Sequence, residues 1–156
     1  LPISMQCCQR LDNRSLRPSG VPAEDLNAAG VVLRALQTRA KPDVDRAVST
    51  HLGLARRGAG YAENAIQFAA VLGRLDDAFA VADAYYFSRG FVVPDVRFSV
   101  MQDVFTPLQE RQTNLLFWPS TAALRADPRF QPLVAEIGLA RYWQEAGVRP
   151  DYQRTV

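Results

Sequence analysis

The chain has 156 residues, of which 48% are hydrophobic and 22% charged, the balance of an ordinary globular domain that can bury one core. No apolar run approaches the roughly 18 residues that a membrane-spanning helix needs. The 18 basic and 16 acidic residues leave a net charge of +2 and alternate along the chain. The sequence therefore lacks the clustered basic stripe that direct nucleic-acid contact requires.

Residue usage gives expectations about source and compartment. All basic residues except Lys41 are arginine and alanine is abundant, as GC-rich codons produce, so we expect a bacterial source. Cys7 and Cys8 are adjacent, and because a bridge between neighbours is strained, we expect free thiols in a reducing cytoplasm. The chain starts at Leu1 without signal-peptide features, so we expect a segment of a longer cytoplasmic protein.

Residues 1–24 are predicted to be a polar arm or linker, with one short helix around residues 3–11. Turn-forming and polar residues interrupt any helical period in this stretch, namely Asp12, Asn13, Ser15, Pro18, Ser19, Gly20 and Pro22. From Asp25 onward, apolar residues recur three or four apart, namely Leu26, Ala29, Leu33 and Leu36. This spacing predicts a helical domain over residues 25–156, whose first helix ends near Ala40.

Three further helices are predicted in chain order. Residues 42–57 start with a proline, which suits a first helical turn, and then show helical apolar spacing. Residues 60–72 and 76–88 follow, with Gly73 suited to a left-handed cap and Asp76 to capping the fourth helix. Connections this short predict antiparallel hairpins, and hence an all-α fold of stacked hairpins.

The second hairpin, ENAIQFAAVLGRLDDAFAVADAYYFSRG at residues 63–90, resembles a tetratricopeptide repeat. The resemblance rests on the turn glycine Gly73, the acidic pair Asp76 and Asp77, and Ala78, where the paired helices touch. The first helix departs from the family pattern, since it lacks the usual Leu-Gly pair and large aromatic residue. What the resemblance implies is a right-handed α-solenoid that binds other polypeptides.

The C-terminal run LFWPSTAALRADPRFQPLVAEIGLARYWQEAGVRPDY, residues 116–152, is similar to the end of a family of bacterial regulators. These proteins join a winged-helix DNA-binding domain, or a cyclase domain, to tetratricopeptide-like repeats. The matching residues are Leu124, Asp127, Pro128, Arg129, Phe130, Gly138, Leu139, Tyr142, Trp143, Gly147, Pro150 and Asp151. The resemblance implies a sensory or interaction module of a transcriptional or signalling protein.

From its residues alone, the same tail is predicted to be a capping element that closes the stack. Asp127 suits a helix cap with Pro128 in the first turn, although Pro132 leaves the start of this helix open. Gly138 separates two apolar faces, which hold Phe130, Leu133, Val134 and Ile137, then Leu139, Tyr142, Trp143 and Ala146. We expect the aromatic residues Trp118, Tyr142 and Trp143 to be packing residues, with Trp143 buried.

Residues 91–119 show neither helical nor strand periodicity, although Phe91–Pro94 favours extended backbone. A long aromatic-rich segment of this kind either packs on the core or carries function, and packing is favoured. Tyr85 continues an inner helix face, so a core position is favoured for it over a ligand cage.

No catalytic, metal or cofactor site is predicted. His51 is the single histidine and lies on an apolar helix face, which favours a buried or edge residue with a local hydrogen bond over a ligand. Its titration near neutrality leaves a pH-sensing role open. Gly58-Ala59-Gly60 lacks the features of a phosphate loop and is interpreted as a helix terminator. No base is placed near the hydroxyl groups of Ser99, Ser120 and Thr121.

The favoured hypothesis is a non-catalytic scaffold that binds a protein or peptide partner. In tetratricopeptide-like arrays the first helix of each hairpin lines the concave side, so Asn64 and Gln67 are predicted to hydrogen-bond an extended peptide. Arg56 and Arg57 are predicted to attract an acidic segment or a terminal carboxylate.

Two other classes of function remain open. A small-molecule sensor would hold its ligand between helices near His51, Asn64 and Gln67. An enzyme of unfamiliar type would need acidic and basic side chains to converge around His51. Self-association is also expected, because an uncovered stacking face is predicted near residues 26–36.

Overall fold

The protein is all-α in the part that the computed structural model describes, residues 21–101 and 103–153. The regular elements there are helices, and the single strand-like feature among these residues is an isolated antiparallel bridge between Val96 and Phe105. The all-α prediction is therefore confirmed. The predicted helix at residues 3–11, most of the polar arm 1–24 and both cysteines lie outside the described residues.

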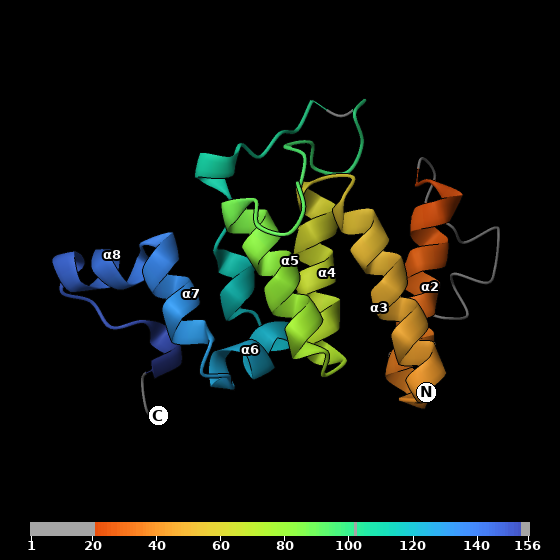
Figure 1. The fold of residues 1–156 in the computed structure, drawn as a ribbon, viewed down its shortest axis with the longest axis horizontal. Helices are drawn as coiled ribbons and strands as arrows, with labels where there is room; N and C mark the ends of the chain where they lie inside the picture. The colour runs from red at the N-terminus through yellow and green to blue at the C-terminus, as the bar shows by residue number, and fades with distance from the viewer. Residues whose placement is uncertain (1–20, 102, 154–156) are drawn as a thin grey trace.

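Four helices pack in chain order as two hairpins (Figure 1). The first hairpin pairs α2 (Ala23–Thr38) with α3 (Lys41–Ala55), and the second pairs α4 (Ala59–Val71) with α5 (Leu75–Phe87). Each helix begins and ends within two residues of its prediction, because apolar spacing and helix-breaking residues mark the same limits.

Helix α4 is the central element of the domain. It packs on α3 and α5, and two later elements, the 3-10 turn η4 (Pro119–Thr121) and the short helix α6 (Ala122–Ala126), also lie against it. Small side chains dominate its buried positions, which lets neighbouring helix axes come close. These small buried residues are Ala59, Gly60, Ala62, Ala65, Ala69 and Ala70.

The turn between α4 and α5 is partly as predicted. Gly73 takes the expected left-handed conformation, with φ of 77°. The predicted capping by Asp76 is wrong, because α5 begins one residue earlier and the residue before it, Arg74, occupies the cap without a side-chain bond. Asp76 lies instead in the first turn, where its carboxylate accepts a 2.7 Å hydrogen bond from Arg129. It therefore ties α5 to the C-terminal tail.

The segment that follows α5 packs on the core only in part, since Met101, Phe105 and Leu108 are exposed. It passes over one end of the helices (Figure 1) and contains two 3-10 turns, η2 (Leu108–Glu110) and η3 (Asn114–Phe117). Its anchors are apolar side chains buried in the main core cluster, namely Val93, Leu115 and Leu116.

Gly58 and Gly60 are needed for a close backbone approach. The N–H groups of Ala59 and Gly60 donate to the carbonyl oxygens of Val96 and Arg97, over 2.6 and 2.7 Å. A Cβ atom on Gly60 would lie 2.5 Å from the Arg97 oxygen, so only glycine fits there. The interpretation of Gly58-Ala59-Gly60 as a helix terminator is therefore wrong, because this stretch begins α4 and its N–H groups bond to residues 96 and 97.

The tail folds as α7 (Phe130–Ile137) and α8 (Leu139–Ala146), separated by Gly138 with φ of 95°, and ends in the 3-10 turn η5 (Asp151–Gln153). Asp127 does not cap α7, because Arg129 precedes the helix and Asp127 accepts the Arg129 backbone N–H at 2.9 Å instead. Pro132 lies in the first turn of α7, where its missing N–H group costs nothing.

Candidate functional site

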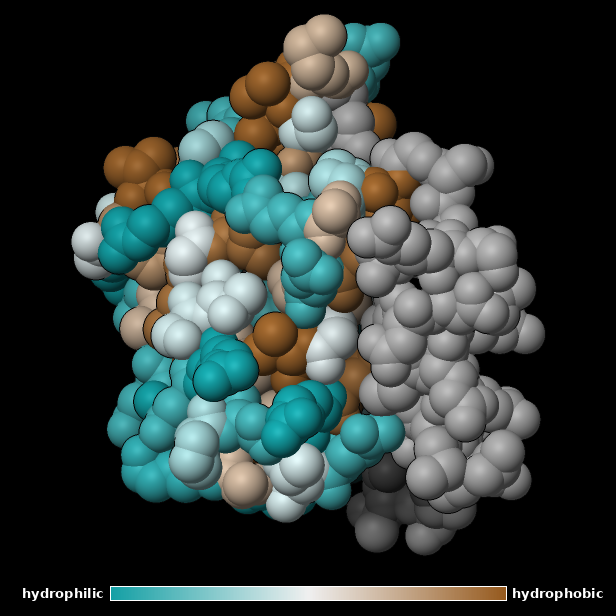
Figure 2. All heavy atoms as spheres, turned by 90° about the vertical axis from the view of Figure 1, so that its right-hand side faces the viewer, coloured by the Kyte–Doolittle hydropathy of each residue, from teal (hydrophilic) through white to brown (hydrophobic). Residues whose placement is uncertain are grey.

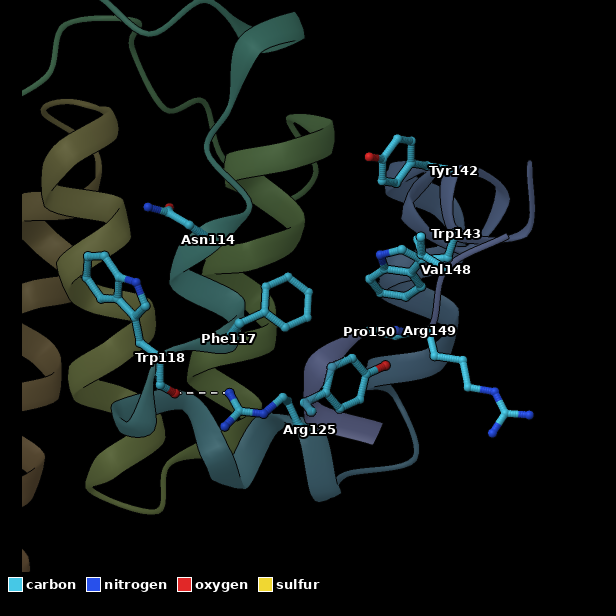
Figure 3. A pocket seen from close by; sticks show the side chains of 10 residues that line it. Asn114, Phe117, Trp118, Arg125, Tyr142, Trp143, Val148, Arg149 and Pro150 are labelled. Atoms are coloured by element: carbon cyan, nitrogen blue, oxygen red, sulfur yellow. Dashed lines mark hydrogen bonds between the residues drawn. The ribbon is translucent and has the colours of Figure 1, made fainter. Parts of the chain in front are cut away.

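An open cleft of about 780 Å³ separates η3 and η4 from α8 and the chain that follows it. Figure 3 shows Phe117 pointing across this cleft toward Trp143, with Arg125 at the base and Trp118 on the same side as Phe117, its ring turned away from α8. Ten residues line it, namely Asn114, Phe117, Trp118, Arg125, Tyr142, Trp143, Val148, Arg149, Pro150 and Tyr152. We refer to this feature as the aromatic cleft.

Local chain reversals build the far wall of the aromatic cleft. Gly147, with φ of 64°, ends α8, and the chain then returns so that residues 148–152 lie opposite η3. Tyr152 places its ring centroid 5.5 Å from that of Phe117, and Trp143 places its own 6.1 Å from Phe117. These ring contacts fix the cleft floor, since aromatic pairs at such distances attract.

Three aromatic residues of the cleft are more exposed than predicted. Tyr142 is 61% exposed and Trp118 43% exposed, and Trp143 is half-buried rather than buried. For Tyr142 and Trp143 the physical reason is that α8 packs mainly on α7 and has no fully buried residue. Trp118 lies between the short turns η3 and η4. The prediction that all three serve only as packing residues is therefore wrong for Tyr142 and Trp118.

The polar groups of the aromatic cleft divide into occupied and free ones. The guanidinium group of Arg125 donates to the carbonyl oxygens of Leu116 and Trp118 over 2.8 and 3.0 Å, so Arg125 holds the base of the cleft in shape. The Asn114 amide is exposed and has no hydrogen-bond partner within the described chain. Arg149 projects from the rim (Figure 3), and no Asp or Glu is among the lining residues that the structure describes. These described lining residues therefore carry positive charge.

The residues predicted to bind a partner lie elsewhere, on or beside α4. Asn64 lines a smaller pocket between α2, α3 and α4. Gln67 is engaged inside the protein, since its amide donates to the Glu63 carbonyl and accepts from Ser120 at 3.1 Å. The Arg56 guanidinium lies over the Phe91 ring at 4.3 Å, and Arg57 pairs with Glu24 at 2.6 Å. The structure thus gives these four side chains separate surroundings.

A buried ionic network around Glu63 was not foreseen from the sequence. Glu63 is 5% exposed and accepts hydrogen bonds from Arg97 at 2.8 Å and from the Tyr85 hydroxyl at 2.8 Å. Burial, and then the Glu63 carboxylate, raise the pKa of Tyr85. The one signal in the sequence is a charged residue inside a helix of otherwise small and apolar positions.

Arg111 extends this network on the other side of Tyr85. Its guanidinium lies 4.9 Å from the Tyr85 ring centroid and donates to Asp95 at 2.7 Å. The side chain is 2% exposed, and its stacking on the ring offsets part of the cost of burying the charge. The network therefore joins residues 95–111 to α4 and α5, and its role is structural.

The side of the molecule formed by α2 and α3 carries the surface predicted to self-associate. Leu26, Leu33 and Leu36 of α2 are half-buried. Apolar side chains show between hydrophilic ones on this side (Figure 2). Self-association through this surface stays a prediction.

The comparisons with known proteins identify no relative. No family model, no curated protein and no solved structure matches this chain. Within the described residues, no three side chains of the His, Cys, Asp and Glu types are grouped so that they can hold a metal ion. In the same part of the chain, no helix is long and apolar enough to cross a membrane.

Proposed function

We propose that this chain is a non-catalytic interaction module that holds an extended, proline-containing segment of a partner protein in the aromatic cleft. The observation that carries the proposal is an open cleft walled by five aromatic rings, two of which remain exposed. A soluble monomer rarely leaves large aromatic side chains gathered at its surface unless they contact something.

The chemistry of the walls favours this occupant. Proline-rich segments adopt an extended helix without internal hydrogen bonds, and they dock on grooves lined by aromatic rings because little ordering entropy is lost. The free Asn114 amide can donate to a carbonyl of such a backbone and accept from one of its N–H groups. The positive charge of Arg149 at the rim favours a segment with an acidic residue next to its prolines.

We place this module in a bacterial transcriptional or signalling regulator of the cytoplasm. The supporting argument is the similarity of residues 116–152 to the tails of such regulators, whose repeats are tetratricopeptide-like. On this proposal, the hairpins α2–α3 and α4–α5 are tetratricopeptide-like units of a right-handed solenoid, and α7 and α8 form its C-terminal cap. The cleft then lies between the turns η3 and η4 on one side and that cap on the other.

Tryptophan fluorescence tests the proposal directly, because the only two tryptophans of the chain, Trp118 and Trp143, both line the cleft. A peptide of eight prolines flanked by two glutamates should produce a saturable change in emission. A peptide of the same length and charge, with glycine and serine in place of proline, should not. Equal changes with both peptides, or none with either, would refute the proposal.

Two substitutions sharpen this test. Trp118→Ala and Tyr142→Ala remove exposed rings, so the fold should persist while affinity falls about tenfold. Phe105→Ala is the matched control, since Phe105 is an aromatic residue 58% exposed that does not line the cleft. Asn64→Ala/Gln67→Ala should leave this affinity unchanged. Loss of binding in that double variant alone would move the partner site to α4.

A further inference from the structure

A second pocket, of about 210 Å³, lies between α2, α3 and α4 and is closed on one side by Phe98. Its walls are largely apolar and come from Ala28, Ala29, Leu54, Phe68 and Phe98, with His51, Asn64, Tyr61 and Asp25 as the polar members. An apolar cavity of about 150 Å³ is known to admit benzene, so this pocket accommodates one aromatic ring with a polar substituent.

His51, one of the residues that line this pocket, has an unsatisfied acceptor. The residue is 5% exposed, and its Nε2 atom lies 3.2 Å from the carbonyl oxygen of Ala28. Because a carbonyl only accepts, Nε2 carries the proton and Nδ1 keeps its lone pair in the neutral ring. Nδ1 is buried and has no hydrogen-bond partner within the described chain. Burial lowers the pKa of His51, so the neutral form persists at pH 7.

Such a group is costly to leave alone, because a buried polar atom without a partner loses its hydration and gains nothing in return. The other polar atoms of the pocket do not satisfy it. The Tyr61 hydroxyl donates to the Asp25 carboxylate over 3.0 Å and is therefore occupied. The Asn64 amide has no partner among the described residues and can donate to a ligand oxygen.

We infer that this pocket is a binding site for a small neutral molecule with one aromatic ring and one O–H or N–H donor. The donor points at His51 Nδ1, and the ring packs between Phe68 and Phe98. Where the donor is a hydroxyl, its oxygen also accepts from Asn64. The His51 ring already packs edge-on against Phe68, with centroids 4.6 Å apart, so the acceptor is held in a fixed direction. This site is separate from the aromatic cleft and does not depend on it.

Phenol and toluene form the matched pair of probes, since they share size and shape and differ in one hydroxyl donor. Each is titrated into the full chain while the ring nitrogen and carbon signals of His51 are followed by NMR. Phenol should shift these signals saturably and bind about tenfold more tightly than toluene. Equal affinity of the two probes, or no shift at His51 with either, would overturn the inference.

Variants of the pocket residues locate the bound probe. Ala29→Leu fills the pocket and should abolish phenol binding, and His51→Phe keeps an aromatic ring but should bring phenol down to the affinity of toluene. Should His51→Phe fail to fold, Ala29→Leu and Asn64→Ala still test the site, since both keep His51. Asn64→Ala removes the donor to the phenol oxygen and should weaken phenol binding. Trp118→Ala should bind phenol like the unaltered chain. Phenol binding that survives Ala29→Leu would place the probe elsewhere and refute the site.

Discussion

Replacing glycine by alanine at two helical positions should change stability in opposite directions. In an open helical position this substitution stabilises by about 0.5–1 kcal/mol, because it removes backbone freedom from the unfolded chain. Gly53 in α3 is exposed, and an added Cβ there would meet nothing within 4 Å. We therefore expect Gly53→Ala to raise the free energy of unfolding by that amount.

Gly60→Ala should instead lower the free energy of unfolding by about 2 kcal/mol. The added Cβ would lie 2.5 Å from the Arg97 oxygen and 2.7 Å from two carbon atoms of the Phe98 ring. The oxygen cannot retreat without loss of the 2.7 Å hydrogen bond from the Gly60 N–H, worth about 1 kcal/mol. Phe98 cannot retreat without leaving Tyr61, whose ring centroid is 5.5 Å away.

Urea unfolding of the two variants and the unaltered chain, followed by far-ultraviolet circular dichroism, measures both changes. The pair controls for helix propensity, since both substitutions are identical in chemistry and both lie in helices. If Gly60→Ala proves as stable as Gly53→Ala, residues 96–97 do not lie against the start of α4, and the reasoning fails.

Substitutions at three other residues test separate parts of the fold. Glu63→Ala should cost about 3 kcal/mol in urea unfolding, because the half-buried Arg97 loses its partner and the buried Tyr85 hydroxyl loses its acceptor, and Glu63→Gln should cost less. Trp143→Ala should cost about 2 kcal/mol, below the 3–5 kcal/mol typical of a fully buried aromatic residue, and an unchanged melting temperature would contradict its packing on Phe117. Stability should also depend on pH through His51, because burial lowers the pKa of this residue in the folded chain. The stability that the neutral His51 contributes is fully present above the ordinary histidine pKa of about 6.5. It is lost as pH falls from there toward the folded-state pKa, by at most about 1.4 kcal/mol per pH unit. His51→Phe should lack this loss between pH 7 and 5.5.

The helices could be predicted because their information is local. Between residues 23 and 87, apolar spacing and breaking residues such as Pro42 and Gly73 lie within the segments they define. The burial of His51 was predicted for the same reason, since its helix face is apolar. Its predicted local hydrogen bond is wrong, because Nε2 bonds to the carbonyl oxygen of Ala28 in α2, 23 positions away. The position of a cap, which depends on one residue of register, was predicted less well, as Asp76 and Asp127 show.

The aromatic cleft could not be predicted, because its walls meet through contacts distant in sequence. Phe117 ends one 3-10 turn and Trp118 lies between it and the next, in a stretch without apolar periodicity, and Tyr142 and Trp143 share a helix with the spacing of a buried face. Helix α8 packs mainly on α7 and meets the main core through Leu139 and Trp143, which leaves Tyr142 exposed. Gly60 was misinterpreted for a similar reason, since the need for glycine comes from Arg97 and not from its neighbours.

The central place of α4 has a consequence for how the domain comes apart. In a linear repeat array each unit touches only its neighbours, so unfolding can proceed from one end. Here Ser120 donates to Gln67 across 53 positions, and η4 and α6 lie on the same helix as α3 and α5. We therefore expect one cooperative transition, with the slowest amide hydrogen exchange in α4. A single proteolytic cut between residues 108 and 126 should destabilise both hairpins together, rather than trim the last unit from an otherwise intact stack.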